Sequence, residues 1–338
     1  MKASDLKKIL EVPFSIGKSF SPITEYIYVN KNVIKSTDLE SYLEVSLNED
    51  MPFQGCVLKE PLQKFLNSID KNTELNFEVN NNVLMVLYGK KNKFSIPMED
   101  LNNFPESPVV KYTENSFVQS LYITQEVVEE FERAIKFASD TDSSFNGLFL
   151  NGDKVYSSNR EIIYSGKLEI EDSYSTFIPK NLIKYILKFK DFFNTIEIFE
   201  QGFKVKGDLM TLFSPNLGEH KIPDFEEVLN NYKTLSITKT QITEELKNCV
   251  TRIKQFDEVV NIFIKEKTIN IFTNNINEVI EFENYISKEY SFKFNTNYLK
   301  MILDMCDYCN ILTKGDLTQP QAFGGNTDKY KIISAVIV

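Results

Sequence analysis

The chain has 338 residues, a length typical of two or three domains, and a formal net charge of −10 at pH 7. Its 42% hydrophobic and 25% charged residues exclude a disordered chain, and it has no run of about 18 apolar residues that would predict a membrane span. The acidic balance, taken alone, argues against nucleic acid as a ligand, because phosphate binding needs a basic surface. Four cysteines are too few for a disulfide framework, and residues 1–6 lack the apolar core of a signal peptide, so we expect a cytoplasmic protein.

Three segments of the chain have the same hairpin pattern, in which two alternating apolar runs flank a short polar turn. They are residues 26–38, 148–159 and 262–274. Each is followed by a third alternating stretch, such as 42–45 or 279–282. Alternation around a polar turn predicts β-hairpins.

A helix is predicted at a fixed distance after each hairpin, because apolar residues recur at i, i+3 and i+4. A lysine occupies the same place in every copy: Lys64, Lys184 and Lys300, which are 120 and 116 residues apart. Thr37 and Ser158, at the hairpin ends, are 121 residues apart, so two landmarks indicate one repeat. The apolar faces are expected to be Leu62/Phe65/Leu66, Leu182/Tyr185/Ile186 and Tyr298/Met301/Ile302.

A further helix is predicted before each hairpin, at residues 4–11, 124–138 and 238–255, the first ending at Pro13. Extended linkers are expected to begin at the similar junctions 104–106 and 222–224, where proline follows an apolar residue. The predicted fold class is α+β, with three tandem copies of one domain that has helices in one layer and antiparallel sheets in the other. The domain boundaries are predicted at 1–114, 115–230 and 231–338.

Basic residues gather on the six predicted helices, whose summed formal charge is +5 although the chain carries −10. The clearest stripe is Lys180, Lys184 and Lys188, at i, i+4 and i+8, with no acidic residue in its segment. A solvated helix face would explain any single stripe, but recurrence across copies favours a surface that tracks DNA phosphates without reading bases. The residues predicted to contact DNA are Lys64, Lys180, Lys184, Lys188, Lys247, Arg252, Lys254 and Lys300.

The order of several short motifs resembles the bacterial-type DNA sliding clamp, the β subunit of the replicative DNA polymerase. The motifs are Ser36-Thr37-Asp38-Leu39-Glu40, Phe94-Ser95-Ile96-Pro97, Phe145-Asn146-Gly147-Leu148, Ile222-Pro223-Asp224-Phe225 and the final segment 330–338. The resemblance extends over nearly the whole chain, as a divergent member of that family. Frequent Asn, Lys and Ile residues fit a phage or an AT-rich genome.

The resemblance implies that two three-domain chains close head to tail into a homodimeric ring around double-stranded DNA, with helices lining the hole. It implies a processivity factor without enzymatic activity, cofactor or metal, which tethers the replicative polymerase and is loaded by a clamp loader. Lys18 and Ser139 fall where the family contacts DNA, but only Lys18 keeps the family's chemistry and is predicted as a DNA contact. A pocket for partner peptides would use Phe145, Ser157, Asn159, Arg160, Ile162, Asn230, Lys331 and Ile333.

Three departures from the family affect this pocket. The family's Thr-Asp-Gly-His-Arg-Leu aligns with residues 157–162, Ser-Ser-Asn-Arg-Glu-Ile. Asn230 replaces a family proline, and residues 333–336 replace the usual Met-Pro-Met-Arg ending. We therefore expect the peptide preference to differ from the family's standard motif.

Two other functions stay open from the sequence. A clamp-fold relative could act as an assembly or decoy protein without encircling DNA. An unrelated enzyme could use Cys306 and Cys309, the single histidine His220, or Asp140 and Asp142. The cysteine pair lacks the second pair that structural zinc needs, and no phosphate-binding or dinucleotide motif is present.

Overall fold

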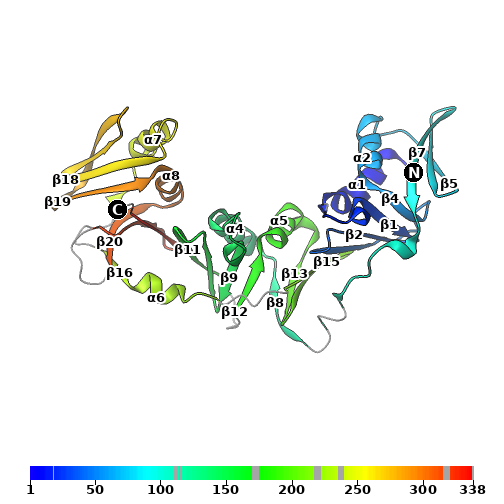
Figure 1. Cartoon of the computed structure of the whole chain (residues 1–338), viewed down its shortest axis with the longest axis horizontal. Coiled ribbons are helices and arrows are strands. Elements are labelled where there is room, and N and C mark those ends of the chain that lie inside the picture. Colours follow the sequence, from blue (N-terminus) through cyan, green and yellow to red (C-terminus); the bar gives the residue numbers. More distant parts are fainter. Residues whose placement is uncertain are drawn as a thin grey trace. The chain divides into compact units, whose positions relative to one another are not determined.

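The computed structural model describes residues 1–17, 19–109, 113, 116–169, 175–216, 222–234, 240–314 and 320–336. It divides into two compact units, Met1–Val128 with Lys184–Glu219, and Glu129–Ile183 with His220–Val338. Helices and antiparallel sheets build both units (Figure 1), so the predicted α+β class is confirmed.

The first unit is built on an eleven-stranded antiparallel sheet with strand order β5-β6-β7-β4-β1-β2-β3-β15-β14-β13-β8. Helices α1 (Ala3–Ser15) and α2 (Lys59–Ser68) contact each other beside this sheet (Figure 1). Ile27 and Val29 alternate with half-buried residues, which is the pattern of a strand with one face on the core. The strands are β1 (Tyr26–Asn30), β2 (Val33–Thr37), β3 (Tyr42–Ser46), β4 (Gly55–Leu58), β5 (Leu75–Asn80), β6 (Val83–Tyr88), β7 (Asn92–Glu99), β8 (Phe117–Tyr122), β13 (Thr195–Phe199), β14 (Gly202–Lys206) and β15 (Met210–Pro215).

The second unit contains a nine-stranded antiparallel sheet with order β12-β9-β10-β11-β22-β21-β20-β16, in which β17 also pairs with β20. Its strands are β9 (Gly147–Asn151), β10 (Lys154–Ser158), β11 (Ile162–Lys167), β12 (Ser175–Pro179), β16 (Tyr232–Thr234), β17 (Thr240–Gln241), β20 (Tyr308–Lys314), β21 (Ala322–Asn326) and β22 (Tyr330–Ala335). A separate pair joins β18 (Val259–Phe272) to β19 (Asn277–Asn295). The remaining α-helices that the structure describes are α4 (Gln125–Ala134), α5 (Lys180–Lys188), α6 (Phe225–Asn230), α7 (Glu244–Ile253) and α8 (Thr296–Met305).

The first two predicted hairpins are present as β1–β2 and β9–β10. The third is contained within the single strand β18. Asn261 Nδ2 donates a hydrogen bond to Phe272 O at 3.3 Å, although eleven extended residues would span about 36 Å. β18 therefore folds back on itself, and Glu266, with a φ of 54°, lies in the turn. The third copy thus keeps the predicted hairpin.

One side-chain hydrogen bond recurs in all three copies of the repeat. The first residue of each second helix donates to a carbonyl in the loop that follows the first helix. Lys59 Nζ donates to Ile16 O at 3.2 Å, Lys180 Nζ to Ala138 O at 2.9 Å, and Thr296 Oγ1 to Asp257 O at 2.8 Å. All three donor residues are buried, so the bond satisfies a carbonyl and joins the two helical segments of each copy.

This hydrogen bond gives a more accurate register for the repeat than the lysines do. Lys184 and Lys300 each lie four residues after the donor, whereas Lys64 lies five residues after Lys59. The prediction that Lys64 is equivalent to the other two is therefore wrong by one residue, which is about 100° around a helix. The residue of α2 in the equivalent position is Gln63.

Three helix predictions also need correction. α1 continues through Pro13 to Ser15, because Val12 and Pro13 are buried and packing compensates for the lost hydrogen bond. α7 covers only Glu244–Ile253 of the predicted 238–255, since β17 occupies part of that range. In α8 the buried face is Leu299, Ile302 and Leu303, while Tyr298 and Met301 are half-exposed.

We predict that Lys180→Met lowers the free energy of unfolding by about 1–3 kcal/mol, because the carbonyl of Ala138 loses a charged donor. Lys184→Met, on the exposed side of the same helix, should change it by less than about 0.5 kcal/mol. Urea unfolding of both variants measures the difference. Equal stabilities would show that the buried hydrogen bond contributes nothing to the fold.

Candidate functional site

An aromatic cluster covers the face of the nine-stranded sheet on which α6 packs. We call it the outer cluster. Phe225 of α6 stacks on Tyr156 with ring centroids 4.9 Å apart, and lies 5.1 Å from the ring of Phe149. Its buried members are Phe149, Tyr156, Phe177, Phe225, Leu229, Leu312, Ala322 and Ile333, with Phe145, Ile163, Ile222 and Tyr232 packed against them.

Strand register decides which side chains reach this cluster. Tyr156 is opposite Phe149 in β9–β10, and Ile163 is opposite Ile333 in β11–β22. Because successive side chains of a strand point to opposite faces, Ser157 and Ile162 point to the other face of the sheet. Tyr164, on that other face, stacks on Phe137 from the helical segment.

The chain enters the cluster through the start of α6, where Asp224 caps the helix by accepting a hydrogen bond from Glu227 N at 2.8 Å. Asp at the N-cap followed by Glu three residues later is a recognisable helix start. The sequence therefore contained a signal for α6, although only an extended linker was predicted there.

A polar group borders the outer cluster. Glu226 accepts hydrogen bonds from Lys154 Nζ at 2.7 Å and from the hydroxyl of Tyr156. These two bonds lower the pKa of Glu226, while burial raises the pKa of Tyr156. Burial also lowers the pKa of Lys331, partly offset by Glu226. The cluster thus has a charged margin that can orient a polar ligand.

Arg160 covers another side of the cluster. Its backbone has a φ of 78°, and its guanidinium pairs with Asp142 at 2.5 Å and lies 5.4 Å from the ring centre of Phe145. Arg160 is 66% exposed, so it can exchange its contact with Asp142 for one with a ligand.

A cavity of about 440 Å³ lies beside the outer cluster on the same sheet. Lys154, Lys331 and Leu312 line it together with Ser165 and Asn310. It is large enough for several residues of an extended chain, and its lining combines apolar surface with hydrogen-bonding groups.

The structure separates the predicted pocket residues into two groups. Phe145, Arg160, Lys331 and Ile333 belong to the outer cluster or its margin, and Asn230 is exposed at the end of α6. Ser157 and Ile162 are fully buried on the opposite face, so their prediction as pocket residues is wrong.

Asn159 lies in the turn between β10 and β11. Its Oδ1 accepts from the backbone N–H of Glu161 and Ile162, both at 3.1 Å, and its Nδ2 donates to Tyr298 at 3.0 Å. It therefore has a structural role in the turn. The left-handed residue of this turn, the one that glycine would favour, is Arg160. The family's Thr-Asp-Gly-His-Arg-Leu motif therefore aligns with residues 158–163 rather than 157–162. Ile163, and not Ile162, then aligns with the final leucine of the motif.

The residues predicted to contact DNA differ in their availability. Lys184, Lys188 and Lys254 are exposed, and no ion pair joins them to any described residue. Four others pair with acidic neighbours: Lys64 with Glu60, Lys247 with Glu244, Arg252 with Glu278, and Lys300 with Asp304. Such surface pairs are weak and can be replaced by phosphate.

Two further cations complete the predicted DNA set, and Ser139 occupies a position where the family contacts DNA. Lys180 is buried and bound to Ala138 O and Asp140, so it is not a free surface charge and its prediction as a DNA contact is wrong. Lys18 lies outside the described residues. Ser139 is buried, and its Oγ accepts from the backbone N–H of Thr141 and Asp142, which holds the loop rather than a phosphate.

The described residues that an unrelated enzyme could use are buried or paired with neighbouring side chains. Cys306 and Cys309 are buried, and burial raises the pKa of both thiols to about 12, which leaves them un-ionised. Asp140 pairs with Lys180, and Asp142 caps a turn and binds Arg160. His220 lies outside the described residues. In the described part of the chain no three His, Cys, Asp or Glu residues are grouped as metal ligands.

The fold is that of a bacterial DNA polymerase sliding clamp. The DNA polymerase sliding clamp from Pseudomonas aeruginosa superposes with a TM-score of 0.83 at 16% identity, covering 100% of this chain and 98% of that one. The DNA polymerase III subunit beta from the same organism gives 0.82 at 15% identity, covering 100% and 99%. The Helicobacter pylori beta clamp bound to a DNA ligase peptide gives 0.82 at 16% identity, again covering 100% and 99%.

No family model and no curated protein matches the chain. Among the described residues, no helix is long and apolar enough to cross a membrane.

We predict that the two neighbouring isoleucines of β11 respond differently to truncation. Ile162→Ala should cost about 2–5 kcal/mol of unfolding free energy, because Ile162 is completely buried under the helical face. Ile163→Ala should cost clearly less, since Ile163 is only partly buried beside the outer cluster. Denaturant unfolding distinguishes them, and equal losses would contradict the assignment of the two faces.

Proposed function

We propose that this protein is a DNA sliding clamp, a non-enzymatic processivity factor that encircles duplex DNA and tethers a replicative polymerase in the cytoplasm. The observation that carries the proposal is the full-length likeness to bacterial sliding clamps, which extends from the first residue to the last. The three repeats support a division into domains at 1–114, 115–230 and 231–338, each with one buried hydrogen bond between its helical segments.

The proposed ring closes by a strand pairing that the chain already uses twice. The third strand of one copy pairs with the last strand of the next, as β3 with β15 and β11 with β22. In the third copy the corresponding strand is Asn277–Glu281 of β19, which pairs with β18 on one edge. In the first copy the last strand is β7, which pairs with β6 along Asn92–Pro97 and with β4 only through Met98 and Glu99.

The part of β7 that β4 leaves unpaired would pair with Asn277–Glu281 of β19 in a second copy of the chain. Two such junctions give a closed head-to-tail dimer. An exposed hydrophobic side chain supports the pairing of β19 with a second chain, since Val279 of this strand is 59% exposed.

The helices would supply the DNA-facing surface of the ring. Lys184, Lys188 and Lys254 are the exposed cations without acidic partners in the described structure, and the paired cations Lys64, Lys247, Arg252 and Lys300 would assist them. Contacts to phosphate of this kind are independent of sequence and weakened by salt, which suits movement along the duplex.

The outer cluster and its cavity would hold short peptide motifs of the polymerase and the clamp loader. The Helicobacter pylori clamp was solved with a DNA ligase peptide, and this chain shares its fold. An apolar anchor of the peptide would pack on the partly buried Phe145 and Ile163, which the buried Ile333 supports from β22. Arg160 and Lys331 are available for the polar groups of the peptide.

We expect the triple variant Lys184→Glu, Lys188→Glu, Lys254→Glu to reduce processive synthesis on primed circular DNA. Each lost phosphate contact should lower the log–log salt slope of binding by roughly 0.9. The matched control reverses three exposed lysines on strands or strand turns, Lys31, Lys267 and Lys293, which lie outside the proposed ring junction and the peptide cavity, and so changes the net charge equally. If both triple variants reduce processivity to the same extent, the helices do not form the DNA-facing surface.

Val279→Asp should convert the dimer to a monomer, because it places a charge at the edge proposed to pair with β7 of a second chain. Light scattering should give twice the 39.2 kDa chain mass for the natural protein and the single chain mass for the variant. Leu209→Asp, a change at a 44% exposed residue outside the proposed junction, should remain dimeric. A natural protein that is monomeric at micromolar concentration would exclude the proposed ring.

A further inference from the structure

The first unit has a junction between copies that is equivalent to the one beneath the outer cluster. Tyr42 of β3 is opposite Phe213 of β15, just as Ile163 of β11 is opposite Ile333 of β22. The aromatic residue that covers each junction is also repeated. Phe104 lies 5.5 Å from the ring of Tyr28 in β1, as Phe225 lies 5.1 Å from Phe149 in β9.

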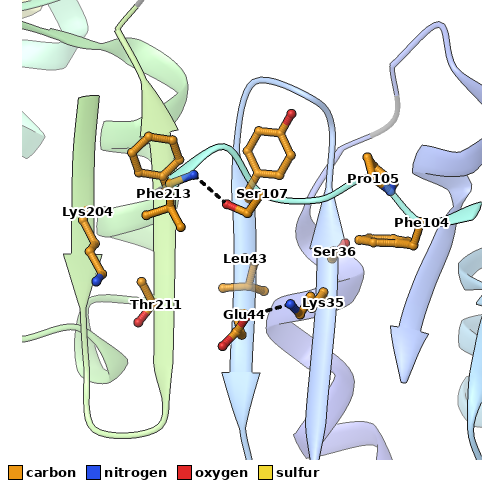
Figure 2. Close-up of a pocket in the computed structure, with 12 residues that line it drawn as sticks. Lys35, Ser36, Leu43, Glu44, Phe104, Pro105, Ser107, Lys204, Thr211 and Phe213 are labelled. Carbon is orange, nitrogen blue, oxygen red and sulfur yellow. Dashed lines mark hydrogen bonds and ion pairs between the residues drawn. The ribbon is translucent and has the colours of Figure 1, made fainter. Parts of the chain in front are cut away.

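The two junctions differ in how they are filled. In the second unit, Leu229 of α6 completes the apolar packing over the sheet. In the first unit a cavity of about 150 Å³ remains between the strands and the segment that follows Phe104. Figure 2 shows this segment, with Phe104, Pro105 and Ser107, crossing the strands that carry Leu43, Thr211 and Phe213.

The cavity has a definite chemistry. Its apolar lining comes from Tyr42, Phe104, Val109 and Phe213, and its volume suits one large apolar side chain rather than a drug-sized ligand. At its border, Lys35 pairs with Glu44 at 3.0 Å and is thereby neutralised.

Lys204 is the remaining cation at this border. It is half-buried, and no described acidic residue forms an ion pair with it. A ligand that fills the cavity would therefore gain from carrying a carboxylate within reach of Lys204.

We propose that this cavity is a second peptide-docking pocket, which accepts a short segment of a partner protein with one Leu- or Phe-sized side chain next to an Asp or Glu. The apolar side chain fills the space between Phe104 and Phe213, and the carboxylate pairs with Lys204. This pocket lies within the first unit and requires neither DNA binding nor the outer cluster.

Methyl NMR of the full chain, titrated with the capped tripeptide acetyl-Glu-Phe-Glu-amide, tests the proposal. Val109 and Thr211 report on the cavity, while Ile163, Leu229 and Ile333 report on the outer cluster. Binding at the proposed pocket should shift the first set of methyls in a saturable manner. Acetyl-Gln-Phe-Gln-amide should bind it at least about fivefold more weakly, because the charged contact is lost.

Two variants keep the test independent of folding. Lys204→Gln should weaken the acidic peptide about fivefold or more and leave the neutral peptide unchanged. Lys93→Gln, which removes a charge elsewhere on the same sheet, should affect neither peptide. Shifts confined to Ile163, Leu229 and Ile333 would overturn the second pocket while supporting the outer cluster. Equal binding of the two peptides, or no shift of the first methyl set at millimolar peptide, would also overturn it.

Discussion

Strand pairing between successive copies of the repeat is the constraint on which the other features of this chain depend. β3 pairs with β15 and β11 pairs with β22, so each large sheet continues from one copy into the next. Backbone hydrogen bonds in these pairs fix the register, and alternation then decides the face on which each side chain lies. Ile163 and Ile333, 170 residues apart in sequence, meet on one face for this reason alone. A shift of one residue in the strand register would bring different side chains to this face of the sheet.

The sequence predicts the repeat, the α+β class, the hairpins and the two helices of each copy, because their periodicities extend over many residues, but it does not predict the short helix α6. It did not predict the faces of β11, since Ile162 and Ile163 are adjacent isoleucines and either could point to the outer cluster. The backbone of Arg160 resolves this, and its left-handed conformation cannot be read from an arginine. Lys180 was misassigned because helical spacing puts it in line with Lys184 and Lys188. At the first residue of α5 its long side chain instead reaches the preceding loop.

Charge placement connects the fold to the proposed function. Several helix cations pair with acidic residues only three or four positions away, so an overall acidic chain keeps its positive groups in local, weak pairs. Surface pairs of this kind contribute little to stability and exchange readily with phosphate. A protein that must hold DNA without fixing its position needs such contacts, and topological closure rather than affinity would then retain it on the duplex.

Topological closure is tested most directly by comparing retention on circular and linear DNA. The protein would be loaded onto a nicked circular plasmid by a clamp loader, then washed at about 1 M salt, where the Debye length is only about 3 Å and phosphate contacts are screened. A protein that encircles DNA should stay on the circle and be released when a single cut linearises the plasmid. Equal release from circular and linear DNA would contradict encirclement.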